Sequence, residues 1–74
     1  MVADPDLEAL GREVRRAREA KGLSQEQLAE RSGLHRNYIG GIERGQRNVG
    51  VKAFLALTDA LGTTAGRIFS NADL

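Results

Sequence analysis

Cysteine is absent from this sequence of 74 residues, and histidine and proline occur once each. Without cysteine the chain can form no disulfide, no thiolate metal site and no cysteine nucleophile, and a single histidine provides no histidine cluster for a metal. Aromatic residues make up 4%, too few for a base-stacking sheet of the RNA-binding kind. These absences predict a protein without a metal, a cofactor or a small-molecule ligand.

Long apolar runs are also missing. None approaches the roughly 18 residues expected of a membrane span, and no basic stretch followed by an apolar core begins the chain. We therefore expect a cytoplasmic protein with no membrane partner. The length allows one domain at most, which would cover residues 1–74.

The small excess of positive charge is concentrated in one segment. The net charge of the chain is +1, which by itself predicts no polyanionic partner. Residues 35–48 hold three arginines and one glutamate, whereas the segment before them is net negative and the segment after them is balanced. A local basic patch suits phosphate contact better than a uniformly basic surface does. An ordinary solvated face would have the same composition.

Glycines at positions 22, 33, 45 and 62 divide the chain into short helical segments. Asp4 and Pro5 are suited to begin the first helix, and Ser24 with Gln27 has the spacing of a capping box. The pattern predicts an all-α fold of five short helices at roughly 5–21, 24–32, 35–44, 51–61 and 64–70. The apolar stripes expected to face inward include Val51, Phe54, Leu57 and Leu61 of the fourth helix and Ala65, Ile68 and Phe69 of the fifth.

The second and third segments have the spacing of a helix-turn-helix, because they meet across Ser32-Gly33-Leu34. Ala29 provides the small residue needed in the second segment, where the third segment crosses it closely. Gly33 tolerates the positive φ of the turn. Ile39 and Ile42 can face the core. The outward face of the third segment would then be formed by His35, Arg36, Asn37, Gly40, Gly41 and Arg44.

Three strings of sequence carry a resemblance to a known family: GLSQEQLAERSGL, NYIGGIERGQRN and ALTDALG. Together they resemble the XRE-type, phage-repressor-like DNA-binding domains over nearly the whole chain. The IERGQRN string, with Tyr38 shortly before it, is similar to the controller proteins of restriction-modification systems. The resemblance implies a lambda-repressor-like fold with its helix-turn-helix at helices 2 and 3, in a bacterial regulator that acts at the nucleoid.

The resemblance also implies which residues contact bases. In the family the second helix of the motif enters the major groove, and its first residues meet the base edges. Here those residues are His35, Arg36 and Asn37. Arg36 is expected to bind guanine, because a guanidinium can donate two hydrogen bonds to O6 and N7. Asn37 can pair with adenine or bind a phosphate.

A second group is expected to contact the DNA backbone. Its members are Ser24, Gln25, Tyr38, Arg44, Gln46, Arg47 and Asn48. Ser24 and Gln25 begin a helix, whose free N–H groups and positive dipole end favour a phosphate. Local capping by Ser24, plain packing of Tyr38 and simple solvent exposure of Arg44 are the alternatives.

Two features of the third segment suggest structural roles. The resemblance implies an ion pair between Glu43 and Arg18 that locks the recognition helix to the scaffold, although Glu43 could instead face a transcription partner. Gly40 and Gly41 each cost a helix about 1 kcal/mol relative to alanine. Close approach to DNA and a tight helix crossing inside the protein are the two explanations.

A single short helix contacts only a few base pairs, so we expect a homodimer on a pseudo-palindromic operator with half-sites about 34 Å apart. The candidate interface residues are Leu55, Thr63, Ile68, Phe69 and Leu74. Leu55 lies off the apolar stripe of its helix and is the clearest of them. The alternative is that these residues complete one small core.

The function expected from the sequence is that of a homodimeric regulator of double-stranded DNA, a controller that activates and represses its own promoter with RNA polymerase as a further partner. A prophage repressor or an antitoxin that represses its own operon is the alternative within DNA binding. A protein-interaction module without DNA contact is the alternative outside it. An enzyme is not expected, because the sequence has no nucleophile–base–acid set, phosphate loop or metal-ligand spacing.

Overall fold

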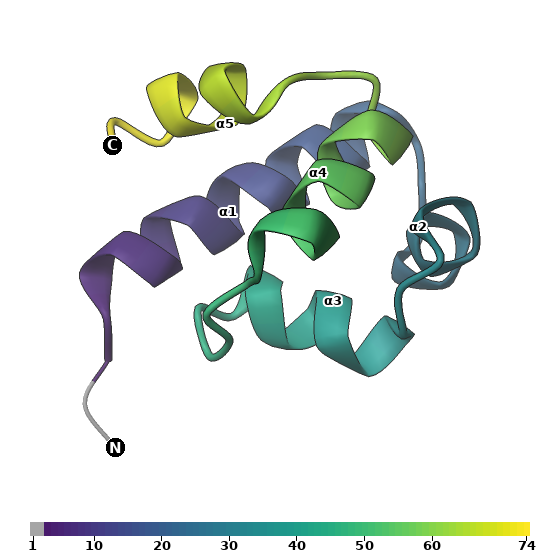
Figure 1. The fold of residues 1–74 in the computed structure, drawn as a ribbon, viewed down its shortest axis with the longest axis horizontal. Helices are drawn as coiled ribbons and strands as arrows, with labels where there is room; N and C mark the ends of the chain where they lie inside the picture. The colour runs from purple at the N-terminus through teal and green to yellow at the C-terminus, as the bar shows by residue number, and fades with distance from the viewer. Residues whose placement is uncertain (1–2) are drawn as a thin grey trace.

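The computed structural model describes residues 3–74, which form five helices and no strand (Figure 1). The helices are α1 (Pro5–Ala20), α2 (Gln25–Ser32), α3 (Arg36–Glu43), α4 (Val51–Ala60) and α5 (Ala65–Asn71). The expected all-α class is confirmed, and each helix begins and ends within one residue of its expected bounds.

Side-chain caps explain where several helices begin. The Asp4 carboxylate accepts hydrogen bonds from two backbone N–H groups in the first turn of α1. Ser24 and Gln27 form the complete capping box of α2, with bonds of 3.0 and 2.9 Å. Thr64 caps α5 by accepting from the N–H of Arg67 at 3.1 Å. These caps satisfy N–H groups that have no partner inside a helix.

Apolar side chains from all five helices form one core. Helix α1 packs against α3 and α5, α2 packs against α3 and α4, and α4 packs against α5. The core residues are Leu10, Val14, Leu23, Leu28, Ile39, Ile42, Phe54, Leu57, Leu61 and Ile68. In Figure 1 α3 lies along the lower edge of the molecule, so only one of its faces is covered by the other helices.

Helices α1 and α3 approach each other closely at Gly11. A Cβ atom at this position would press against the carbonyl oxygen of Ile42 and would lie 2.7 Å from that of Glu43. Backbone atoms cannot swing aside as a side chain can, so the crossing needs a residue without a side chain. The tight crossing that the sequence allowed at Gly40 and Gly41 therefore occurs at Gly11.

Three expectations about burial are corrected by the structure. Ile68 is 1% exposed and belongs to the core, so its assignment to a dimer interface is wrong because it has no surface to offer. Val51 was expected inside but is 76% exposed, since it is the first residue of α4 and precedes the buried part of that helix. Gly40 and Gly41 were expected on the open outer face but are buried beneath side chains.

Candidate DNA-binding surface

Helices α2 and α3 form the expected helix-turn-helix. Gly33 ends α2 with a φ of 75° and donates its N–H to the carbonyl of Ala29 at 2.9 Å. Leu34 then packs against the core, and His35 occupies the N-cap of α3. Ile39 and Ile42 bury the inner face of α3, which leaves its outer face toward solvent.

The first residues of α3 are open to a partner. His35, Arg36 and Asn37 are all exposed, and His35 makes no side-chain capping bond. The Nε of Arg36 donates to the carboxylate of Glu26 at 3.2 Å, and both side chains remain more than half exposed. A duplex lying along α3 could therefore reach these three residues, whose contacts with bases stay a prediction.

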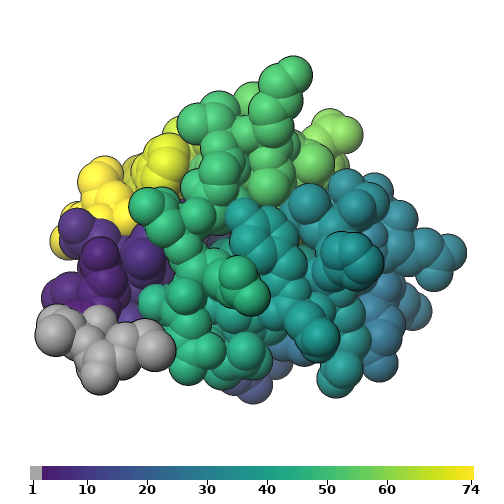
Figure 2. All heavy atoms as spheres, turned by 60° about the horizontal axis from the view of Figure 1, so that its bottom comes forward, coloured from purple at the N-terminus to yellow at the C-terminus, as the bar shows by residue number. Residues whose placement is uncertain are grey.

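Helix α3 and the loop of residues 44–50 occupy the centre of one face of the molecule, with α2 beside them (Figure 2). Arg44, Gln46, Arg47 and Asn48 are exposed in this loop. The Nε of Arg44 donates to the amide oxygen of Gln46 at 3.1 Å. The structure thus brings the loop residues expected to contact phosphates next to the helix expected to contact bases.

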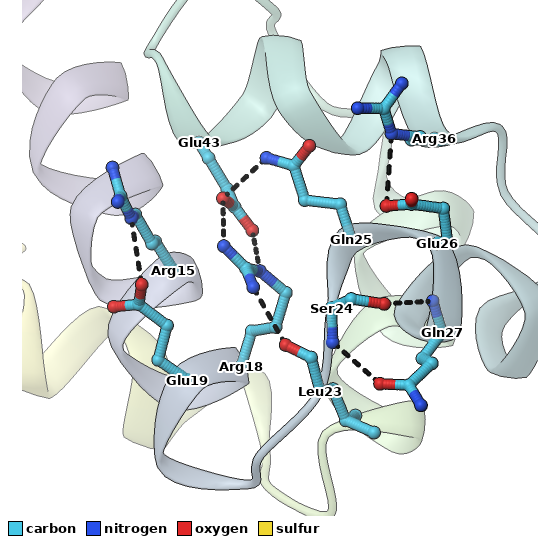
Figure 3. A network of polar contacts seen from close by, with 10 residues as sticks. All are labelled: Arg15, Arg18, Glu19, Leu23, Ser24, Gln25, Glu26, Gln27, Arg36 and Glu43. Atoms are coloured by element: carbon cyan, nitrogen blue, oxygen red, sulfur yellow. Dashed lines mark hydrogen bonds and ion pairs between the residues drawn. The ribbon is translucent and has the colours of Figure 1, made fainter.

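Arg18 and Glu43 form the expected ion pair (Figure 3). Two nitrogens of the Arg18 guanidinium donate to the two carboxylate oxygens of Glu43 at 2.7 and 3.0 Å, and a third donates to the carbonyl of Leu23 at 2.8 Å. Hydrogen bonding to Glu43 raises the pKa of Arg18 above its ordinary value. The Glu43 side chain is 3% exposed, so it ties α1 to α3 and has no surface for a transcription partner.

Gln25 extends this ion pair toward the surface. Its side-chain amide donates to the carboxylate of Glu43 at 3.0 Å, and the side chain is half-buried. The amide expected to clamp a phosphate is therefore held in place by a carboxylate that is itself held by Arg18 (Figure 3). Ser24 is exposed and serves as the cap of α2, as its alternative interpretation required.

Tyr38 joins α3 to the loop that follows it. Its side chain is half-buried against the core, and its hydroxyl accepts the N–H of Gly50 at 3.4 Å. The guanidinium carbon of Arg47 lies 6.0 Å from the centre of the ring. Tyr38 thus has the packing role given as its alternative, with its hydroxyl near the surface.

An apolar groove lies where α1, α4 and α5 meet. It has a volume of about 340 Å³, and the exposed apolar side chains that line it are Val51, Leu55, Phe69 and Leu74. The ring of Phe69 also packs against Phe54 at a centroid distance of 5.3 Å. Three of the expected interface residues therefore share one surface. Thr63 does not line the groove and is half-buried.

Several polar contacts could not be predicted from the sequence. Glu26 pairs with Arg36 from a different helix, and Asn71 of α5 donates to Glu13 of α1 at 3.2 Å. Hydrogen bonding to Arg16 and Asn71 lowers the pKa of Glu13, with Arg16 making the larger contribution. The Glu26–Arg36 and Glu13–Asn71 contacts join residues from separate helices, so no local spacing could reveal them.

Residues 3–74 contain no cluster of three or more acidic, histidine or cysteine side chains that could hold a metal ion. Within the same residues, every helix is too short or too polar to cross a membrane.

Comparison with known proteins identifies the family. Residues 14–68 match the Helix-turn-helix family. The control protein C.SmaI of Serratia marcescens is 46% identical over 67 residues, which cover 90% of this chain and 80% of that protein. The restriction-modification controller protein C.AhdI from Aeromonas hydrophila superimposes with a TM-score of 0.85 at 52% identity, covering 86% of this chain and 97% of C.AhdI.

A third relative was solved with DNA. The restriction-modification controller protein C.Esp1396I, as a tetramer in complex with its natural 35 base-pair operator, superimposes with a TM-score of 0.83 at 32% identity. The match covers 92% of this chain and 90% of that one. The present chain belongs to the XRE-type helix-turn-helix family of DNA-binding transcription regulators, and it is similar to the controller proteins of restriction-modification systems.

Proposed function

We propose that this protein is a controller protein that binds a pseudo-palindromic operator in its own promoter as a homodimer and regulates transcription there. The observation that carries the proposal is the arrangement of α3. Its first residues are exposed, while its last residue is fixed to α1 by the buried Arg18–Glu43 pair. The operator complex of the C.Esp1396I tetramer supports the same function for this chain.

The exposed start of α3 contacts bases in this proposal. Arg36 donates two hydrogen bonds to a guanine, and His35 and Asn37 contact the neighbouring base edges. The pairing of Arg36 with Glu26 supports this role, because it uses Nε and not the two terminal nitrogens that would donate to O6 and N7.

The surrounding residues hold the DNA backbone. Arg44, Gln46, Arg47 and Asn48 act from the loop after α3, and Ser24 and Gln25 act from the start of α2. Tyr38 contributes its hydroxyl. Phosphate contacts of this kind set the register of a protein on DNA without specifying the sequence.

The groove between α1, α4 and α5 is the surface through which two copies associate. Leu55, Phe69, Leu74 and Val51 would lose their contact with water in such a dimer. Pairing two recognition helices doubles the number of contacted base pairs, which a single short helix needs in order to bind specifically.

RNA polymerase is the further partner in this proposal. A dimer bound over the promoter blocks polymerase, and one bound upstream recruits it. The protein acts in the bacterial cytoplasm on the nucleoid and catalyses no reaction itself.

Binding to a fragment of the gene's own promoter, measured across a series of salt concentrations, tests the proposal. Affinity should fall steeply as salt rises, because bound arginines displace counterions from the phosphates. Arg36→Ala should lose about 1–3 kcal/mol of binding free energy and relax the preference at one base, whereas Arg47→Ala should weaken all sequences alike. Equal loss of discrimination in both variants would refute this division of roles, and absence of salt-dependent binding by the unaltered protein would refute the function.

A further inference from the structure

Gly41 lies inside α3, where the backbone does not require glycine. The four glycines with positive φ are at other positions, namely Gly22, Gly33, Gly45 and Gly62. A glycine in a helix interior weakens the helix relative to alanine. The presence of glycine at position 41 therefore needs an explanation outside the backbone of α3.

The chain turns back over α3 immediately after the helix ends. Gly45 adopts a φ of 73° and donates its N–H to the carbonyl of Ile42 at 3.0 Å. Gln46 donates its N–H to the carbonyl of Gly41 itself at 2.8 Å. These two bonds form a Schellman turn, which satisfies the last carbonyls of the helix and directs the next residue, Arg47, back toward Gly41.

Arg47 covers Gly41 with the aliphatic part of its side chain. An ideal Cβ atom built on Gly41 would lie 2.6 Å from Cγ, 3.4 Å from Nε and 3.6 Å from Cδ of Arg47. The Arg47 stem thus occupies the space that a side chain at position 41 would fill. Beyond the stem, the guanidinium lies over the ring of Tyr38 at 6.0 Å, near the outer limit of a cation–π contact.

Gly40 provides an instructive contrast one residue earlier. A Cβ atom there would lie 2.9 Å from Nη1 of Arg44, which is the far end of a long side chain. Such an end can swing aside at little cost, whereas Cγ of Arg47 lies close to its backbone, which the Schellman turn holds. The two neighbouring glycines therefore differ in what an added methyl group would displace.

We propose that Gly41 is a positioning residue for DNA binding, because its missing side chain leaves a seat on α3 in which the Arg47 stem lies with the guanidinium held beside the recognition helix. This inference rests on the proposed function, in which Arg47 contacts a phosphate. A long side chain loses rotamer freedom when it binds, and a side chain held in place beforehand loses less. The glycine thus acts through Arg47 and does not itself touch DNA.

The test compares Gly41→Ala with Gly66→Ala as the control, each alone and combined with Arg47→Ala. Gly66 lies in α5, which supplies none of the residues proposed to contact DNA. Binding to the gene's own promoter fragment is measured across a salt series. Gly41→Ala should lower the affinity about two- to tenfold, the range expected when one long side chain is no longer held. It should also reduce the salt slope, while Gly66→Ala, where an added Cβ atom would meet nothing within 4 Å, should bind within about twofold of the unaltered protein. With Arg47→Ala present, Gly41→Ala should cause no further loss.

A second measurement tests whether the Arg47 side chain lies against α3 in the absence of DNA. In the free protein, proton NMR resonances of the Arg47 side chain should be displaced by the Tyr38 ring current. This displacement should disappear in Gly41→Ala but persist in Gly66→Ala. Circular dichroism should show both variants folded, since alanine favours a helix over glycine.

Two outcomes would overturn the inference. One is binding by Gly41→Ala that equals that of the unaltered protein. The other is a loss that persists in the Arg47→Ala background, which would mean that the DNA itself needs the glycine. If the unaltered protein does not bind the promoter, the proposed function fails. The NMR measurement still decides whether glycine at position 41 holds the Arg47 side chain against α3.

Discussion

The contact between α1 and α3 differs sharply from the surface formed by α1, α4 and α5. At the first, a buried ion pair and a side-chain-free crossing at Gly11 fix one helix against the other. At the second, Leu55 and Leu74 are about half exposed along a groove that nothing in residues 3–74 fills. The orientation of the recognition helix is thus determined within one chain, whereas the apolar surface is suited to be completed by another molecule.

Of the changes that separate these two regions, removing one partner of the ion pair should have the largest effect on the free energy of unfolding. Glu43→Ala leaves the Arg18 guanidinium buried without its carboxylate, which typically costs about 3–5 kcal/mol. Urea denaturation followed by circular dichroism measures the change in the free energy of unfolding. Arg18→Met combined with Glu43→Met should recover much of the loss, because no unpaired charge remains. A cost below about 1 kcal/mol in Glu43→Ala would mean that the pair does not lock α3.

A charge in the groove should affect association and leave the fold intact. Leu55→Asp should weaken dimerisation by about 1.5–3 kcal/mol per copy, the value of burying one leucine side chain. Sedimentation equilibrium measures the dimer fraction, and Leu55→Met is the control that keeps the side chain apolar. Unchanged association of Leu55→Asp would show that two copies do not meet at this groove.

Adding a methyl group at the helix crossing should destabilise the monomer. Gly11→Ala forces a Cβ atom against backbone carbonyls of α3, and overpacking of this kind costs about 1–3 kcal/mol. Gly66→Ala is the matched control, since a Cβ atom there would meet nothing within 4 Å. The control should gain stability from its higher helix propensity. If Gly11→Ala unfolds at a higher temperature than Gly66→Ala, the close approach of α1 and α3 at Gly11 is contradicted.

The Glu13 carboxylate, which pairs with Arg16 in α1 and accepts a hydrogen bond from Asn71 of α5, should make the smallest contribution. Because hydrogen bonding lowers the pKa of Glu13 below its ordinary 4.5, its ionised form adds stability that is present above that pH and is lost as the pH falls through the lowered value. Glu13→Gln should therefore be less stable at neutral pH, by less than about 1 kcal/mol since Arg16 is largely exposed, and the difference should shrink on acidification. A difference that does not vary with pH would exclude the ionised carboxylate as its source.

The local parts of the fold could be predicted from the sequence. Asp4, Ser24 and Gly33 mark helix ends through bonds to residues only a few positions away, so their spacing is sufficient to recognise them. The Arg18–Glu43 pair is different, because its partners lie 25 residues apart and were expected only from the resemblance to a family.

The missed features depend on how helices meet in space. Gly11 has an ordinary place in an amphipathic helix, and only the passage of α3 beside it explains its lack of a side chain. Ile68 and Phe69 are adjacent in one short helix, and a small rotation decides which of them is buried. The covering of Gly41 by Arg47 likewise requires the turn at Gly45 to be known in three dimensions.

The apolar groove has a consequence for how much protein must be present. Only folded chains can pair, so pairing across the groove would raise the melting temperature as the total concentration rises. A domain of 74 residues buries a modest fraction of its surface, which makes this gain large relative to its own stability. Dilution would then reduce both the paired and the folded population, so that the number of molecules in a cell would itself set the fraction able to occupy a promoter.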